Sequence, residues 1–211
     1  LVAGLAIAVK KINPNMKVYG VQAAGAPSMQ VSIEKKEIIT LPKVDTIADG
    51  ISVKTPGELT FRILRKYCDK VLTVTDDQIS KAIYLLLQRG KLLAEPAGAT
   101  SMAACLFNEG FKKEFKDKKI VPVISGGNIN VSLIDQVIEK GMISDTTRST
   151  IQVILPDQPG NMAKVINTIN SFEEVNIHAI IHERSALVCP IWKAILYVTI
   201  DIMGEEQLNT I

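Results

Sequence analysis

A serine followed by two glycines, Ser125-Gly126-Gly127, ends an apolar run and has the composition of a ligand-binding turn. The run, residues 120–124, is rich in β-branched side chains and predicts a buried strand, although Pro122 favours an edge or a bulge. A strand that presents a hydroxyl at its end, followed by glycines and a helix, is typical of ligand sites in open α/β sheets. The alternative is a turn that needs only glycine dihedrals.

The composition predicts a soluble globular protein. Apolar residues make up 47% of the 211 residues and the net charge is +2, which argues against disorder and against a nucleic-acid partner. Three cysteines without close pairing indicate reduced thiols, so we expect a cytoplasmic location. The apolar residues 1–9 are too few to span a bilayer, and we expect no membrane partner.

Both ends of the sequence interrupt a predicted helix. Leu1 is not a methionine and lies in an apolar helical run, residues 1–12, that we expect to be buried on more than one side. The last helix begins near Gly204 and has barely two turns before Ile211. We therefore expect the chain to be an excerpt from a longer polypeptide.

Turn, capping and periodicity signals predict an α/β layer with a parallel sheet in residues 1–145. The predicted helices cover residues 1–12, 29–36, 56–67, 76–89, 96–106 and 131–140, and the predicted strands residues 17–22, 70–75 and 120–124. Thr55 and Thr75 each stand three residues before Glu58 or Gln78, which predicts two capping boxes. Gly50 lies in a predicted loop and permits dihedrals that other residues avoid. The many Ala, Gly and Ser residues of the fifth helix allow close approach to a neighbouring helix or a ligand.

The character of the sequence changes near Thr146, where we place a domain boundary. Strands are predicted at residues 150–155, 175–182 and 195–203, with helices at residues 161–172 and from residue 205. This order is that of a ferredoxin-like α+β domain cut short before its last strand. The predicted domains are residues 1–145 and 146–211.

Four motifs of the first domain resemble the C-terminal part of the threonine dehydratase and serine racemase family. In chain order they are LVAGLAIAVKKINP, TIADGISVKTPGELTF, LLAEPAGATSMAA and VISGGNIN. The resemblance implies the tryptophan-synthase-β-like fold (fold type II) and the cofactor pyridoxal 5′-phosphate. Two further stretches, PDQPGNMAKVIN and VNIHAIIHER, resemble an ACT-type regulatory domain, which favours threonine dehydratase over serine racemase.

The resemblance also implies roles for individual residues. Ser125, with Gly126 beside it, would offer its hydroxyl to the ring nitrogen of the cofactor. Glu95 would lie beside the ring and Gly50 would place its backbone against it. The amide of Leu1 would remain from a glycine loop that binds the phosphate at a helix N-terminus. A neutral hydroxyl does not hold the ring nitrogen protonated, which keeps the ring a weaker electron sink and favours elimination.

Departures from the family pattern limit these expectations. The lysine that binds the cofactor covalently is expected N-terminal of Leu1, so the excerpt alone should not catalyse. Gln22 and Ser28 stand where serine racemases have acidic cation ligands. His178 and His182 share one face of a predicted strand without a third ligand, so no metal site is expected.

The leading interpretation is an ammonia-lyase that converts L-threonine or L-serine to a 2-oxo acid. A second is an amino-acid-sensing module attached to a scaffold that has lost its catalytic half. Serine racemase is a third, disfavoured by Gln22, Ser28 and the tail. A Rossmann dehydrogenase has little support, because the sequence has no G-x-G-x-x-G followed by an acid.

In the tail, Asp157, Gly160 and Asn161 form a candidate site for an amino-acid effector. The effector's carboxylate would meet free amides at the start of the helix, and Asn161 would reach its amino group. The alternative for these residues is a helix cap, with Asp157 capping nearby amides, combined with a subunit contact. Because ACT-type domains often pair, we expect a homo-oligomer.

Overall fold

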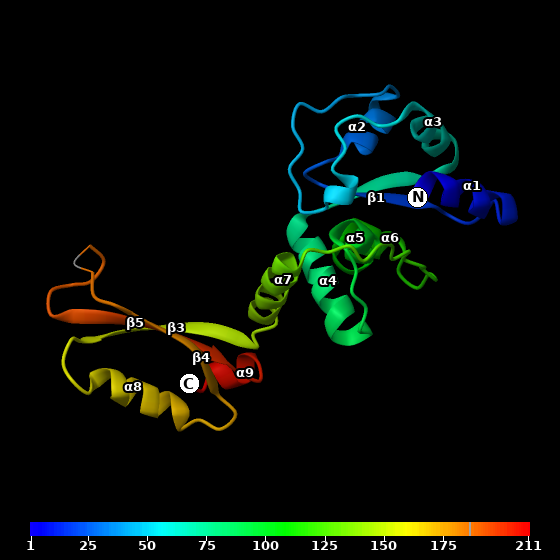
Figure 1. Cartoon of the computed structure of the whole chain (residues 1–211). Coiled ribbons are helices and arrows are strands. Elements are labelled where there is room, and N and C mark those ends of the chain that lie inside the picture. The colour runs from blue at the N-terminus through cyan, green and yellow to red at the C-terminus, as the bar shows by residue number, and fades with distance from the viewer. Residues whose placement is uncertain (186) are drawn as a thin grey trace. The chain divides into compact units, whose positions relative to one another are not determined.

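Residues 1–185 and 187–211 are described by a computed structural model, in which two units each have their own sheet (Figure 1). The units comprise residues 1–137 and 138–211, so that helix α7 (Val131–Ser144) is divided between them. The domain boundary expected near Thr146 stays a prediction. Within the described residues, every helix is too short or too polar to cross a membrane.

Two parallel strands lie at the centre of the first unit. Strands β1 (Tyr19–Ala23) and β2 (Lys70–Val74) pair with Tyr19 opposite Lys70, which confirms the predicted parallel sheet. Helix α5 (Pro96–Phe107) contacts both strands, and Figure 1 shows α2 and α3 on the other side of them. The buried core includes Val71 and Val74 of β2.

Helices α1 (Val2–Ile12), α2 (Ser28–Lys35), α3 (Glu58–Tyr67) and α4 (Asp76–Gly90) begin near the predicted residues. The 3₁₀ helix η1 (Asp49–Ile51) and the short helix α6 (Glu109–Glu114) were not predicted. The capping box of α4 is confirmed, since Thr75 and Gln78 each accept a hydrogen bond from the other's backbone amide. The box predicted at Thr55 is wrong: Gly57 caps α3, and the Thr55 hydroxyl bonds that of Thr40 at 2.9 Å.

Helix α1 is less buried than its apolar sequence predicts. Only Ala3 and Ala6 are buried among its described residues, while Ile12 is 86% exposed. The expectation of burial on more than one side is therefore wrong. The buried positions are three residues apart, so α1 presents a single narrow face to its neighbours.

Residues 120–124 do not form the predicted buried strand. The segment has no ladder partner in the described part of the chain, and Val121 is 84% exposed. Pro122 has no amide hydrogen to donate, which further weakens strand pairing. The β-branched pattern reflects only the residues of the segment itself, whereas a strand also requires a second strand to pair with.

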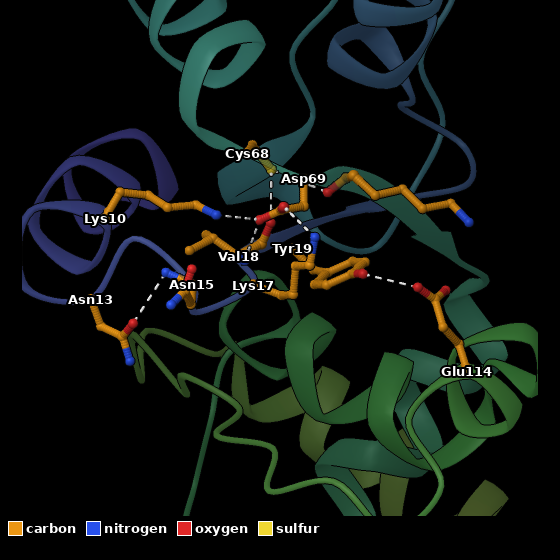
Figure 2. Close-up of polar contacts among 10 residues, drawn as sticks. Lys10, Asn13, Asn15, Lys17, Val18, Tyr19, Cys68, Asp69 and Glu114 are labelled. Atoms are coloured by element: carbon orange, nitrogen blue, oxygen red, sulfur yellow. Dashed lines mark hydrogen bonds and ion pairs between the residues drawn. The ribbon is translucent and has the colours of Figure 1, made fainter.

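Asp69, which directly precedes β2, links the start of β1 to helix α1 (Figure 2). Its Oδ2 accepts hydrogen bonds from Lys10 Nζ and the Val18 amide, both at 2.8 Å, and its Oδ1 accepts one from Lys17 Nζ at 3.2 Å. Burial alone would raise the pKa of Asp69, but these three bonds outweigh it and hold the pKa below its ordinary value. We call this arrangement the Asp69 clamp.

The second unit is a three-stranded antiparallel sheet with one main helix. Its elements are β3 (Arg148–Pro156), α8 (Asn161–Asn170), β4 (Asn176–Glu183), β5 (Lys193–Asp201) and α9 (Glu205–Leu208). The strand order is β3-β5-β4, with β5 in the centre. Its core consists of Leu155, Ile169, Leu196, Val198, Ile200 and Ile202. The predicted order of elements is confirmed; an ACT identity stays a prediction.

Candidate functional site

Glu95 is the centre of the site, at the residue that precedes α5. Its backbone is extended, and Pro96 then occupies the first helical position, where a missing amide hydrogen costs nothing. The Glu95 amide donates to the Gly126 carbonyl at 3.2 Å, and Glu95 Oε2 accepts from the Asn128 amide at 3.2 Å. Backbone and side chain therefore both bind residues 126–128, which fixes the direction of the carboxylate.

Two glycines leave bare backbone around this carboxylate. Gly126 has a φ of +75°, and a Cβ on it would overlap the Glu95 carboxylate. A Cβ on Gly50 would lie 3.7 Å from Glu95 Oε1 and 3.2 Å from Ala97 Cβ. Gly50 is not among the residues with positive φ, so it does not use the dihedral freedom of glycine. Its missing side chain instead leaves room in front of Glu95.

The loop that carries Gly50 is anchored to the end of β2. The Asp49 side chain accepts a hydrogen bond from the Gly50 amide at 2.7 Å. Earlier in the loop, the Thr46 hydroxyl and the Ile47 amide donate hydrogen bonds to the Asp76 side chain, at 2.6 Å and 3.1 Å. Because Asp76 is the first residue of α4 and lies two residues after the end of β2, the sheet positions the loop.

Ser125 lies beside this cluster on the segment that was expected to be a strand. The residue is half-buried, and its hydroxyl has no hydrogen-bond partner within the residues that the structure describes. A Cβ on Gly98 of α5 would overlap the Ser125 carbonyl, so backbone meets backbone there. The hydroxyl is thus available to a ligand while its backbone is held against α5.

The structure brings together four of the five predicted cofactor-binding residues, namely Gly50, Glu95, Ser125 and Gly126. Leu1, the fifth, precedes α1 and takes no part in the described contacts of this cluster. The binding roles of all five stay predictions.

Sequence reasoning missed three further residues, Gly98, Ser101 and Asn128. The Ser101 hydroxyl donates to the Val123 carbonyl at 2.8 Å, and the Asn128 amide holds Glu95. The small residues at positions 98 and 101 did signal a close approach to α5. The sequence offered a helix or a ligand as the partner, whereas the structure shows an extended segment.

Two of the candidate effector residues, Asp157 and Asn161, make polar contacts with other residues of the second unit. Asp157 Oδ1 pairs with Arg184 Nη2 at 3.0 Å and does not cap α8, so its predicted capping role is wrong. Asn161 Nδ2 donates to the Pro156 carbonyl at 3.1 Å. Gly160 precedes α8 with a φ of +88°, and a Cβ there would meet open space.

The histidines and Gln22 have contacts of other kinds. His178 Nδ1 lies 3.1 Å from Arg148 Nη2, and His182 Nε2 is buried without a hydrogen-bond partner. Gln22 closes the loop after β1, since its amide group donates to the Ala26 carbonyl and accepts from the Gln30 amide. Across residues 1–185 and 187–211, no group of three His, Cys, Asp or Glu side chains could hold a metal ion.

Comparison with known sequences extends over the whole chain. Residues 1–126 match the profile of a family described as "Pyridoxal-phosphate dependent enzyme". An L-threonine ammonia-lyase from Thermotoga maritima is 36% identical over 211 residues, which is 100% of this chain and 51% of that protein. The chain therefore spans about half the length of this curated relative.

Two solved structures are similar to the chain over about two thirds of its length. The processed form of threonine deaminase isoform 2 from Solanum lycopersicum has a TM-score of 0.61 at 36% identity, covering 66% of this chain and 40% of that one. Serine racemase from Dictyostelium discoideum has a TM-score of 0.56 at 40% identity, covering 62% of this chain and 41% of that one.

Proposed function

Because the chain belongs to the family of pyridoxal-phosphate dependent enzymes, we propose that its first unit forms one side of the cofactor site of a threonine ammonia-lyase. The reaction converts L-threonine, and also L-serine, to a 2-oxo acid and ammonia. The observation that carries the proposal is the position of Gly50 and Gly126 against the fixed carboxylate of Glu95, with Ser125 directly before Gly126. The whole-chain similarity to an L-threonine ammonia-lyase supports elimination of ammonia over racemisation as the reaction.

The residues around Glu95 fit the pyridine ring of pyridoxal phosphate. A flat ring needs bare backbone to lie against, which Gly50 and Gly126 offer because a side chain on either would crowd Glu95. The ring nitrogen needs a polar partner, and the Ser125 hydroxyl is not hydrogen-bonded to any of the residues that the structure describes. For the phosphate, the chain offers the first turn of α1, where amides are free.

Bound pyridoxal phosphate draws electrons away from the substrate's Cα and so acidifies its proton. The contribution of this chain is to hold the ring and to set its electronic character. Ser125 would bind the ring nitrogen without adding charge. Glu95, directed by the Asn128 amide, would place a negative charge beside the ring rather than at its nitrogen.

The test of this function is Ser125→Ala in the full-length protein. We expect turnover to fall well over tenfold while the variant folds and retains cofactor. Ser132→Ala is the matched control, because the Ser132 hydroxyl donates to the side chain of Asn130 at the start of its own helix. Near-normal turnover of Ser125→Ala would remove Ser125 from the site.

For the second unit we propose a regulatory role, as an ACT-like domain that binds an amino acid. The predicted β-α-β-β order and the uncapped start of α8 after Gly160 support this role. The cationic Arg184 beside Asp157 adds a group that would attract a carboxylate. The same unit is our candidate for assembly into a homo-oligomer, since Ile154 and Ile181 are more than half exposed on their strands.

A further inference from the structure

Within the part of the chain that the structure describes, the segment that carries Ser125 lies on helix α5 and has no strand partner. Glu95, which precedes α5, and two residues of the helix contact it: Glu95 bonds Gly126, Gly98 touches Ser125, and Ser101 bonds Val123. Residue numbers increase along the helix contacts and decrease along the contacted residues of the segment. The segment therefore runs antiparallel to the helix.

These contacts follow one another along both elements. Positions 95, 98 and 101 are three residues apart, which corresponds to a rise of about 9 Å in a regular helix. Their partners, residues 126, 125 and 123, follow in the reverse order at steps of one and two residues.

Small side chains make this approach possible. A Cβ at position 98 would overlap the Ser125 carbonyl, so the segment lies directly on the helix backbone. At this short separation the Ser101 hydroxyl reaches the Val123 carbonyl, at 2.8 Å. Among the described residues, no other side chain holds the carbonyl groups of residues 120–125.

We propose that Ser101 is a positioning residue that fixes the register of this segment on α5 and so directs the Ser125 side chain. The inference rests on the proposed role of Ser125 at the cofactor. A shift of the segment along α5 would move Ser125 relative to Glu95 and Gly50. The bond from the Ser101 hydroxyl to the Val123 carbonyl opposes such a shift, together with the bond from the Glu95 amide to the Gly126 carbonyl.

The test compares Ser101→Ala with Ser101→Thr in the full-length protein. The first removes the hydroxyl and the second keeps it. Thr100→Val is the matched control, because the Thr100 hydroxyl bonds the Ala97 carbonyl of its own helix. One readout is site-resolved amide exchange at Glu95 and Asn128, whose amides bind across the contact. The other is the absorption spectrum of the bound cofactor.

We expect Ser101→Ala to speed exchange at Glu95 and Asn128 by roughly two- to tenfold, the factor expected for one lost neutral hydrogen bond. Its cofactor spectrum should change in the direction seen for Ser125→Ala. Ser101→Thr and Thr100→Val should match the parent protein in both readouts.

The two proposals fail in distinguishable ways. If Ser101→Ala exchanges at the parent rate and leaves the spectrum unchanged, Ser101 does not set the register, whatever Ser125→Ala does. If Ser101→Ala speeds exchange while Ser125→Ala keeps normal turnover and spectrum, the register role stands and the proposed role of Ser125 is wrong.

Discussion

The carboxylate of Glu95 occupies the space that a Cβ on Gly126 would need. Gly126 also has a left-handed backbone, with a φ of +75°. A residue with a side chain is therefore excluded there twice, once by its own dihedral and once by Glu95. The neighbouring Gly127 differs, because a Cβ on it would only touch the Leu93 carbonyl at 3.5 Å.

Gly126→Ala is accordingly expected to lower the free energy of unfolding of the first unit by about 1–3 kcal/mol and to displace Glu95. Gly127→Ala is the control and should cost less than about 1 kcal/mol. Urea denaturation of both variants, read by amide exchange in residues 1–137, measures the difference. Equal losses would show that the space around Glu95 is not restrictive.

Glu95→Gln and Glu95→Ala separate the shape of the Glu95 side chain from its charge. A glutamine still has an oxygen that accepts from the Asn128 amide, whereas an alanine leaves that amide without its partner. We expect Glu95→Ala to speed exchange of the Asn128 amide by roughly 10- to 100-fold, as for a lost bond to a charged group, and Glu95→Gln to have a smaller effect. Identical exchange in both variants would contradict the hydrogen bond.

The Asp69 clamp should make the first unit sensitive to acid. Because the pKa of Asp69 is lowered in the folded state, its stabilisation is fully present above the unfolded value of about 3.9 and is lost as the pH falls through the folded pKa. Asp69→Asn should therefore cost about 1–3 kcal/mol at neutral pH and flatten the loss of stability below about pH 4. Urea titrations at several pH values measure both effects.

Asp45→Asn is the control for this pH dependence. The bond from Lys43 lowers the pKa of Asp45 as well, but both side chains are almost fully exposed and solvent screens the pair. We expect Asp45→Asn to leave stability unchanged within error. A neutral-pH loss as large as that of Asp69→Asn would show that exposure does not separate the two sites.

The proposed effector site predicts a measurable coupling between the units. Titration calorimetry of the full-length protein with isoleucine, valine, threonine and serine should detect binding outside the active site for at least one of them. Gly160→Val and Asn161→Ala should abolish it, whereas Thr168→Ala, further along α8, should not. Affinity shifts of roughly 5–150-fold between effector and substrate are typical of such coupling. If both variants bind the amino acid with the affinity of the parent protein, the site is wrong and an assembly role remains for this unit.

Local signals predicted the elements that depend on local interactions. The Thr75 capping box and the Pro96 helix start are confirmed because each is determined by residues within one turn. The predicted strand at residues 120–124 was wrong, because a strand needs a partner that is distant in sequence. The predicted cap at Thr55 was wrong because the Thr55 hydroxyl bonds that of Thr40, which is also distant in sequence.

The same distinction applies to the site. Ser125 was suggested by its place between an apolar run and two glycines, whereas Glu95 and Gly50 were nominated only through a resemblance, since nothing local links them. Ser101 and Asn128 were missed because each acts through a contact that the fold creates between distant segments. Residue type alone, a small residue in a helix or an asparagine after glycines, does not identify the partner of such a contact.

The central position of β5 has a consequence for synthesis on the ribosome. In the described part of the chain, both β3 and β4 pair only with β5, which is the last of the three strands to be made. At about 5–20 residues per second, translation from the end of β4 to the end of β5 takes about one to four seconds. During that interval the nascent chain carries two strands with unpaired edges, the kind of surface that nucleates aggregation. The yield of this unit in a cell should therefore depend on chaperone capacity and on codon speed across residues 193–201.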